Sequence, residues 1–255
     1  MQQESLAGKG RAKIWQKPHF LPVMRPGGWH GLALISPPFV YSLLMLAAPL
    51  LLVFLLSMWT QNYLELDRTV TLANYREAIS EELYRVLMVR SLVISGVVTV
   101  VTVMLAYPIA YYVAFFGGKR KSMWLLLITI PFWTSYLIRV FLWKVILGYN
   151  GVVNGSLLGL GFIEEPLSFI LYNANAVVIT LAHAWAPFAI LPIFVSLARI
   201  DKSLLEAARD LGDGPIRRFL RVTLPLSMPG VVAASLIVFI PTVGDYVTPR
   251  LLGGT

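Results

Sequence analysis

Three ionisable side chains, Arg139, Lys144 and Asp245, lie within or beside long runs of apolar residues. A charge in apolar surroundings is costly, so such a group usually faces a cavity or an opposite charge. Arg139 lies deep in its run and requires a partner, either a functional ligand or a structural acceptor. Lys144 lies nearer the end of the run, where its long side chain can reach water.

Aromatic residues could join Asp245 in a surface for a cation, because ammonium groups are bound by carboxylates and by the faces of aromatic rings. Together with Arg139, the candidate pathway residues are Trp133, Tyr136, Trp185, Asp245 and Tyr246. The alternative is that these rings pack in the core or lie at the headgroup level of a membrane.

The sequence shows no cluster suited to catalysis or metal binding. Cysteine is absent, which excludes thiol chemistry and zinc–thiolate sites. His183 has no second ligand and no serine partner in its apolar run, which favours a structural role. The sequence also has no Gly-x-x-x-x-Gly-Lys-Ser/Thr loop for nucleotide phosphates. We therefore expect no catalytic residue, metal ion or cofactor on this chain.

Long apolar stretches must position these side chains. The chain is 57% hydrophobic and 13% charged, whereas soluble domains have about 25% charged residues. A helix that crosses a ~30 Å hydrocarbon core needs about 20 mostly apolar residues. Five stretches meet this requirement: 32–58, 91–116, 123–148, 174–198 and 228–247. The sequence therefore predicts an all-α membrane protein, a polytopic helical bundle.

Lysine and arginine are distributed unevenly between these stretches. Residues 1–31 carry five, 117–122 three and 199–227 six, whereas 149–173 carry none. Cytoplasmic segments of membrane proteins retain an excess of these residues. We therefore predict a bacterial inner-membrane protein with a cytoplasmic N-terminus, and we attribute the net charge of +8 to topology rather than to nucleic-acid binding.

The order of basic and apolar segments predicts that the chain has two parts, a cytoplasmic tail over 1–31 and a transmembrane domain over 32–255. The domain includes a cytoplasmic loop over 199–227. Five crossings from an inside N-terminus would leave residues 251–255 outside, without an anchor. We therefore expect a sixth span to be missing from the sequence.

The 199–227 loop has the pattern of two short helices. Ser203 followed by Glu206 is a capping box and predicts the start of the first helix. Gly212 suits the left-handed residue at its end. Its apolar residues recur at the spacing of a single helix face. They are Leu204, Ala207, Ala208 and Leu211.

The second helix of this loop is predicted to start near Pro215, which fits a first turn, and to end at Pro225. It carries three apolar residues, Ile216, Phe219 and Leu220, and three basic ones, Arg217, Arg218 and Arg221. Two interpretations remain open on periodicity alone. The helices present the small residues Ala207 and Ala208 to another protein, or they lie on lipid headgroups.

The order of residues in this loop resembles the EAA motif of ABC importer permeases. Glu206-Ala207-Ala208, three residues, Gly212, nine residues, Val222, one residue and Leu224-Pro225 match the family pattern, which has isoleucine in place of Val222. The resemblance implies that this loop is the coupling helix that docks on an ATP-binding subunit. The implied coupling residues are Ser203, Glu206, Ala207, Ala208, Gly212, Leu224 and Pro225.

Other segments resemble the permeases of spermidine/putrescine importers. They are residues 131–135, 137–139, 151–154 and 239–254. The resemblance implies a type I ABC importer permease fold with six spans and a role in polyamine import. The alternative solute is another small amino or opine-type compound.

The same resemblance implies the partners of this chain. ATP and magnesium would bind to a dimer of ATPase subunits, beside a second and homologous permease chain, an extracytoplasmic solute-binding protein and the lipid bilayer. Closure of the ATPase dimer would move the first loop helix and open the pathway outward. Two other classes lack support: a membrane-embedded enzyme needs a catalytic cluster at one depth, and an ion channel needs a selectivity filter.

Overall fold

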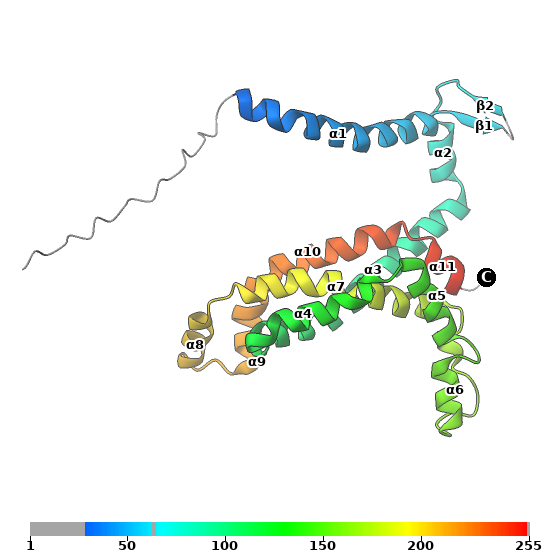
Figure 1. Ribbon diagram of the computed structural model, residues 1–255. Coiled ribbons are helices and arrows are strands. Elements are labelled where there is room, and N and C mark those ends of the chain that lie inside the picture. The colour runs from blue at the N-terminus through cyan, green and yellow to red at the C-terminus, as the bar shows by residue number, and fades with distance from the viewer. Residues whose placement is uncertain (1–28, 63–64, 254–255) are drawn as a thin grey trace, which may run out of the picture. The chain divides into compact units, whose positions relative to one another are not determined.

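The computed structural model describes residues 29–62 and 65–253, which are predominantly helical (Figure 1). The chain divides into two compact units, residues 1–77 and 78–255, which are described separately. Nearly all of the predicted tail over 1–31 lies outside the described residues.

The first unit contains helix α1 (Trp29–Ser57), strands β1 (Thr60–Asn62) and β2 (Glu65–Asp67), and most of helix α2 (Ala73–Ser80). The strands form an antiparallel hairpin in which Thr60 lies opposite Asp67. The side chain of Asn74 donates hydrogen bonds to the carbonyls of Ser57 at 3.0 Å and Trp59 at 2.9 Å. Because the end of a helix leaves carbonyls without partners, these bonds fix α2 against the end of α1.

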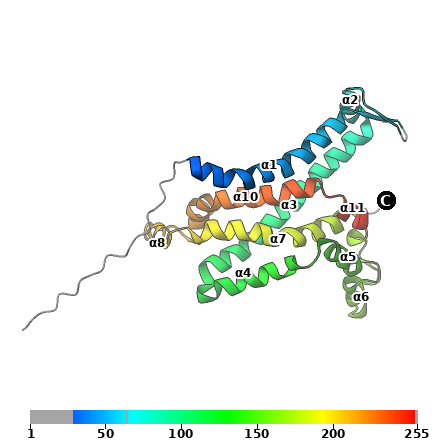
Figure 2. The ribbon, with the colours of Figure 1, turned by 45° about the horizontal axis from the view of Figure 1, so that its top comes forward.

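The second unit is a bundle with three long central helices, α3 (Glu82–Phe116), α7 (Ala174–Ala198) and α10 (Leu224–Val243). They lie side by side in both views (Figure 1, Figure 2). The shorter helices are α4 (Lys121–Thr129), α5 (Tyr136–Leu147), α6 (Val152–Gly159), α8 (Lys202–Asp210), α9 (Pro215–Arg218) and α11 (Val247–Leu252). Three 3₁₀ turns cover Gly118–Arg120, Ile130–Trp133 and Ser168–Ile170, and a π-helical turn covers Phe219–Thr223. Helices α8 and α9 lie at one end of the bundle, and α5 and α11 lie at the other.

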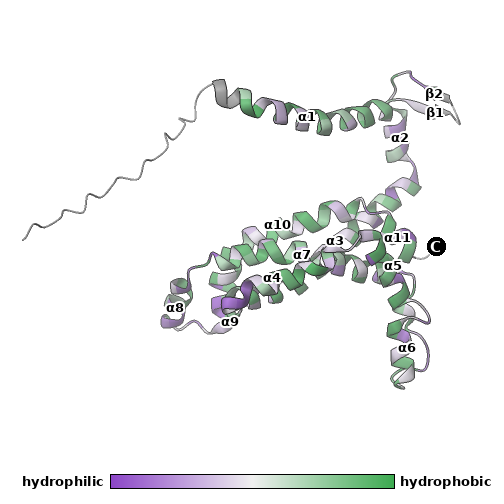
Figure 3. Ribbon diagram, viewed as in Figure 1, coloured by the Kyte–Doolittle hydropathy of each residue, from purple (hydrophilic) through white to green (hydrophobic). Residues whose placement is uncertain are grey.

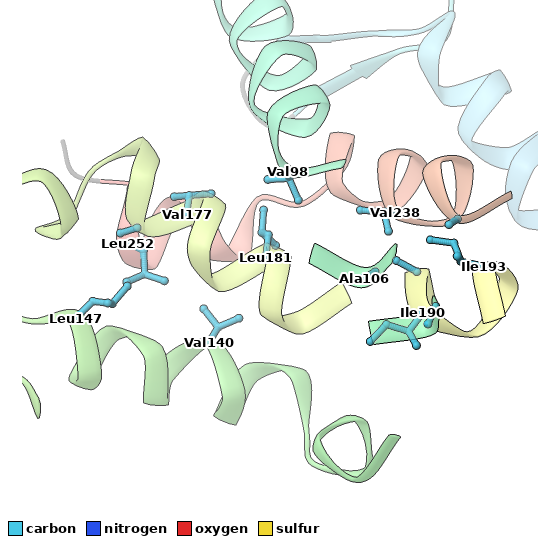
Figure 4. Close-up of a cluster of buried hydrophobic side chains, with 14 of the residues drawn as sticks. Val98, Ala106, Val140, Leu147, Val177, Leu181, Ile190, Ile193, Val238 and Leu252 are labelled. Carbon is cyan, nitrogen blue, oxygen red and sulfur yellow. The ribbon is translucent and has the colours of Figure 1, made fainter. Parts of the chain in front are cut away.

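Small and β-branched side chains fill the core between the central helices (Figure 4). Val98 and Ala106 of α3 and Val238 of α10 are buried there. A Cβ atom at Gly230 would lie only 2.4 Å from the Ser196 hydroxyl oxygen. Glycine is therefore required where α10 approaches α7, as is typical of membrane helices that associate through close packing.

The described residues contain five helical stretches that are long and apolar enough to cross a membrane. They are Ala33–Ser57, Glu82–Phe116, Tyr136–Gly159, Ala174–Ala198 and Pro215–Val243. The predicted all-α class and the predicted number of apolar stretches are therefore confirmed. Figure 3 shows hydrophobic residues along α7 and α10 and hydrophilic residues on α8 and α9.

The third predicted span, 123–148, is wrong as a single helix. Helix α4 ends at Thr129, a 3₁₀ turn follows, and Thr134 and Ser135 adopt extended backbone, with ψ of 151° and 137°, before α5 begins. Pro131 explains the break, because proline has no N–H to donate and its ring conflicts with the carbonyl four residues earlier. The break leaves backbone carbonyls inside the bundle without helical partners.

The connection between α6 and α7 is anchored by Asn154, which is fully buried. Its Nδ2 donates to the carbonyl of Gly148, and its Oδ1 accepts from the N–H of Leu167, both at 3.0 Å. The Asn154 side chain therefore joins Gly148, before α6, to Leu167 in the connection that follows it. Asn154 lies in one of the segments that carried the family resemblance, and its role here is structural.

Candidate functional site

Arg139 of α5 binds backbone carbonyls from the break between α4 and α5 and from helix α7. Its side chain is nearly inaccessible, with 6% of the residue exposed. Nη1 donates to the carbonyl of Ala184 on α7 at 3.1 Å, and Nη2 donates to Thr134 at 3.1 Å, with a longer contact of 3.5 Å to Phe132. The partner that the sequence required for Arg139 is thus a set of backbone acceptors. The guanidinium joins α5 to α7.

A cavity of about 320 Å³ lies beside this residue, and we call it the Arg139 cavity. It is lined by Phe132, Tyr136, Arg139, Ala184, Trp185, Phe188, Pro241 and Asp245. The charged groups in this lining are Arg139 and Asp245, which form no ion pair with each other. The lining is otherwise largely apolar and aromatic, as in most small-molecule sites.

Asp245 lies in the turn between α10 and α11 and is held through both carboxylate oxygens. Oδ1 accepts from the backbone N–H groups of Val247 at 3.0 Å and Thr248 at 3.4 Å. Oδ2 accepts from the phenol of Tyr136 at 2.6 Å. Because Tyr136 has only one hydroxyl proton, the hydroxyl of Thr248, 2.8 Å away, donates to the phenol oxygen. These bonds join α5 to the α10–α11 turn and fix the carboxylate at the cavity.

The structure brings four of the six candidate pathway residues to this cavity, namely Tyr136, Arg139, Trp185 and Asp245. Trp133 does not line it and is 79% exposed. Tyr246 lines a neighbouring cavity of about 290 Å³ together with Arg90. Asp245 lines both cavities.

Two buried N–H groups of residues that line the Arg139 cavity, Arg139 Nε and Trp185 Nε1, have no hydrogen-bond partner among the residues that the structure describes. Buried donors in native proteins are nearly always paired with protein or water. Neither nitrogen is accessible to solvent in this structure, so an acceptor atom in the cavity reaches these donors only when neighbouring side chains move. After such a movement, the cavity would offer both N–H donors and the carboxylate of Asp245 to one small molecule.

Sequence analysis missed Phe132, Phe188 and Thr248 as parts of this site. The rings of Phe132 and Phe188 meet edge to face with centroids 4.7 Å apart, and Phe188 also lies 5.3 Å from the Trp185 ring. Pro131 signals the break that directs Phe132, rather than its neighbour Trp133, toward the cavity. Nothing in the local sequence signals Thr248.

His183 of α7 is exposed and is paired with an aromatic residue of α5. Its Nδ1 accepts a hydrogen bond of 3.1 Å from the indole N–H of Trp143. Within residues 29–62 and 65–253, no three His, Cys, Asp or Glu side chains are placed to hold a metal ion. The pairing with Trp143 gives His183 a role in joining α5 to α7.

The first helix of the 199–227 loop, α8, starts differently from the prediction. Its N-cap is Asp201, whose carboxylate accepts the backbone N–H of Ser203 at 3.0 Å. The predicted capping box of Ser203 and Glu206 is therefore wrong, because the aspartate two residues earlier takes the capping position. Hydrogen bonds from Ser203 hold the pKa of Asp201 below its ordinary value.

Gly212 ends α8, as the sequence predicts. Its φ of 85° is left-handed, a conformation that favours glycine at a helix C-terminus. Its N–H donates to the carbonyl of Arg209 at 2.9 Å, and the N–H of Asp213 donates to Ala208 at 3.0 Å. The last carbonyls of α8 therefore receive partners within the turn.

The predicted single apolar face of α8 is split in the structure, and this part of the prediction is wrong. Ala208 is 7% exposed and packs against the rest of the second unit. Glu206 and Ala207 are exposed, and Leu211 is 87% exposed. Because Leu211 lies beyond the last turn of α8, it does not keep the direction of Ala208. One side of α8 anchors the loop, and the other faces away from the chain.

The second predicted helix does not end at Pro225. Helix α9 passes into the π-helical turn and then directly into α10, which contains Pro225 in its first turn. An ion pair of 3.5 Å joins Arg221 to Asp213, at the end of α8. The second half of the loop therefore continues into α10 as one uninterrupted helical segment.

Known proteins have sequences similar to that of this chain. Residues 106–255 match the family described as binding-protein-dependent transport system inner membrane component. The spermidine/putrescine transport system permease protein PotB of Haemophilus influenzae is 39% identical over 72% of this chain, which spans 64% of the length of that relative. The inner membrane ABC transporter permease protein YdcU of Escherichia coli is 31% identical over 99% of this chain and 82% of its own length.

Solved structures share the fold. The crystal structure of a bacterial ABC transporter that imports alginate aligns with a TM-score of 0.63 at 16% identity, covering 89% of this chain and 81% of the other. A structure of an alginate transporter in complex with a pentasaccharide-bound periplasmic protein gives 0.63 at 18% identity, covering 87% and 79%. With the match over residues 106–255, these relatives show that the chain belongs to the family of binding-protein-dependent transport system inner membrane components.

Proposed function

We propose that this chain is the permease subunit of an ATP-driven importer and that its 199–227 loop docks on an ATPase subunit. The two sides of α8 carry this proposal. Ala208 packs inward, whereas Leu204, Leu211 and Ile216 are exposed apolar side chains on a short polar loop. Exposed apolar residues gathered on one polar element mark an interaction surface.

In this proposal ATP and magnesium bind to a dimer of ATPase subunits, and a second, homologous permease chain completes the pathway. A solute-binding protein delivers the solute on the outer side, as the periplasmic protein in one of the related structures suggests. The excess of basic residues in 1–31, 117–122 and 199–227 supports a cytoplasmic N-terminus and a cytoplasmic loop in this proposal.

The connection between loop and cavity supports an alternating-access mechanism. Closure of the ATPase dimer displaces α8, and the displacement passes into α10. Helix α10 contains Pro241, which lines the Arg139 cavity, and it leads to the turn of Asp245. The loop and this turn lie at opposite ends of the bundle (Figure 1), so movement at one end can alter the cavity at the other.

We propose a polyamine as the solute, because the related PotB protein is named as a spermidine/putrescine permease. Asp245 supplies a carboxylate and Trp185 an aromatic ring at the cavity, and both bind ammonium groups. The guanidinium of Arg139 weakens the binding of a polycation there. Weak binding suits a pathway that must release its solute.

The unpaired donors favour a second candidate, a small amino compound that also carries a carboxylate, as opine-type solutes do. Arg139 Nε and Trp185 Nε1 have no partner in the described part of the chain, and an ionised carboxylate is a strong acceptor for such groups. Asp245 would bind the amine of the same molecule. A polyamine has no oxygen atom for these donors, so the two candidates differ in their use of the Trp185 N–H.

Docking is tested by purifying the assembled transporter through this chain and measuring the ATPase subunit that remains bound. Glu206→Lys reverses an exposed charge, and Gly212→Asp places a side chain at a left-handed residue, so both are expected to abolish co-purification. Gly161→Asp makes the same change at another left-handed glycine, with a φ of 72° and open space at its Cβ position, and is expected to leave the complex intact. An ATPase that stays bound to both loop variants contradicts the proposal.

The solute is tested by ATP hydrolysis of the transporter reconstituted in lipid, with putrescine, spermidine or 4-aminobutanoate added. The polyamine candidate predicts equal stimulation by putrescine in wild type and in Trp185→Phe, because the ring remains. The second candidate predicts stimulation by 4-aminobutanoate that is several-fold weaker in Trp185→Phe. Hydrolysis that responds to none of these compounds contradicts both candidates.

A further inference from the structure

The joint between the 199–227 loop and α10 is the π-helical turn over Phe219–Thr223. At its end the N–H of Leu224 donates to the carbonyl of Phe219, five residues earlier. Pro225 accounts for the wide turn, because in a regular α-helix its ring would press on the carbonyl of Arg221. Such turns are rare and occur frequently at functional positions.

An aromatic side chain of this turn is held by α3. The ring of Phe219 lies edge-on to the ring of Tyr107, with centroids 5.6 Å apart and planes at 89°, and to that of Tyr111 at 6.4 Å and 74°. This is a favoured geometry for aromatic pairs. Residues four apart lie on one face of a helix, so the two tyrosines form one surface. We call Tyr107, Tyr111 and Phe219 the aromatic cluster.

A hydrogen bond ties the other side of the π-turn to the same part of α3. The hydroxyl of Tyr107 lies 2.8 Å from Oγ of Ser227, which is fully buried. Ser227 directs its proton to the carbonyl of Leu224 at 3.0 Å, so Tyr107 is the donor to Ser227. Tyr107 therefore contacts the chain on both sides of the turn, at Phe219 and at Ser227.

The π-turn also receives the end of α8. The ion pair between Arg221 and Asp213 joins the turn to the residue that follows Gly212. The Arg221 side chain is exposed whereas that of Asp213 is partly buried, and ion pairs at the surface add little stability. Its position shows that a displacement of α8 reaches the π-turn before it reaches the regular part of α10.

Helix α3 extends from the aromatic cluster to the other end of the bundle. It has 35 residues, which corresponds to about 52 Å at 1.5 Å per residue. Near its start, the hydroxyl of Ser91 donates to the carbonyl of Val243 at 2.8 Å, two residues before Asp245. Arg90 and Ser91 line the cavity that shares Asp245 with the Arg139 cavity. A shift of α3 therefore acts on the turn that holds Asp245.

We propose that Tyr107 and Phe219 are positioning residues that make α3 move with the loop, so that α3 and α10 shift together when the ATPase subunits close. Without these contacts the π-turn absorbs part of the displacement, and α3 stays behind. The proposal rests on the importer function above, and it assigns the transmission of movement to contacts outside the docking surface.

The test measures movement of α3 directly, in the assembled transporter in lipid. This chain has no cysteine, so Met88→Cys, at an exposed position near the start of α3, carries one fluorescent label when the partner subunits are also cysteine-free. ATP with vanadate then traps the closed ATPase dimer. We expect the label signal to change on trapping in the wild-type background.

Two variants separate the contacts. Phe219→Leu removes the aromatic ring but keeps apolar volume, and Tyr107→Phe removes the hydroxyl but keeps the ring. Each is expected to reduce the label response several-fold while ATPase binding and ATP hydrolysis stay near the wild-type values. Tyr112→Phe, at an exposed position on the same helix, is the matched control and is expected to change nothing.

The outcomes distinguish this inference from the proposed function. An ATPase subunit that never binds the wild-type chain contradicts the importer proposal itself. If the subunit binds and the label responds equally in wild type, Phe219→Leu and Tyr107→Phe, the positioning role is overturned. Loss of assembly in both variants also overturns it, because the contacts would then only stabilise the fold.

Discussion

Helix α8 and the Arg139 cavity, at opposite ends of the bundle, are shaped by different kinds of contact. At one end, neighbours in the sequence shape α8: Asp201 caps it through Ser203, and Gly212 ends it. At the other end, the Arg139 cavity depends on contacts between distant segments. Tyr136 binds Asp245, which lies 109 residues away in the sequence, and Arg139 binds Ala184 across 45 residues.

This difference indicates how the two regions can act in a transporter. A loop shaped by local contacts keeps its form when it is pushed by a partner. A cavity shaped by contacts between helices changes form when those helices shift. The loop is thus suited to receive a force, and the cavity is suited to respond to it.

The largest effect is expected from Arg139→Met. The variant removes the two hydrogen bonds of 3.1 Å from the guanidinium to the carbonyls of Ala184 and Thr134, and a hydrogen bond from a charged group contributes about 1.5–3 kcal/mol. We expect the free energy of unfolding to fall by about 3 kcal/mol, measured by denaturant unfolding in detergent. Lys144→Met removes the same charge from the same helix without these acceptors and is expected to have a far smaller effect. Equal losses in the two variants would show that charge, and not the carbonyl contacts, sets the stability of this end.

A smaller effect is expected from Tyr136→Phe. The variant removes the hydroxyl that donates to Asp245 and accepts from Thr248. A hydrogen bond to a charged group contributes about 1.5–3 kcal/mol, so we expect unfolding to become easier by about 2 kcal/mol. Tyr149→Phe, at an exposed position, is the control. An unchanged stability in Tyr136→Phe would mean that the α10–α11 turn holds Asp245 without help from α5.

The same contrast explains what the sequence could predict. Gly212 and four of the five apolar stretches were predicted correctly because their signals are local: a left-handed residue and a run of apolar side chains. The capping box failed because Asp201 and Ser203 both suit an N-cap, and only the entry path of the chain decides between them. Because the capping-box pattern favours Ser203 as the N-cap, the predicted start of the helix lies two residues too late.

The cavity could be predicted only as a set of candidates. Arg139 was identified as a charge that needs a partner, but two of its acceptors, the carbonyls of Phe132 and Thr134, lie in the helix break near Pro131, and the third lies on α7. Residues 123–148 were predicted to form one continuous span, which contains no such break. The pairing of Tyr136 with Asp245 depends on the packing of α5 against the α10–α11 turn, for which no local pattern exists.

Gly212→Ala should affect the loop and leave the cavity unchanged. A side chain at a φ of 85° costs about 1 kcal/mol. Gly214 has a φ of −66° and open space around its Cβ position, so Gly214→Ala is the matched control without strain. We expect hydrogen exchange to become faster in α8 of Gly212→Ala only. Faster exchange at α5 or α11 as well would contradict the view that the loop is shaped locally.

The smallest effect concerns the protonation of Asp201. Because hydrogen bonds from Ser203 lower its pKa, the ionised cap stabilises α8 fully above the ordinary carboxyl value of about 3.9. This stabilisation is lost as the pH falls through the lowered pKa of the folded state. We expect hydrogen exchange in the first turn of α8 to lose protection over this acidic range in the wild type. Asp201→Asn keeps a capping oxygen that does not titrate, so its protection should stay constant. An equal loss in both would show that the cap is not responsible, and the start of α8 would then depend on more than Asp201.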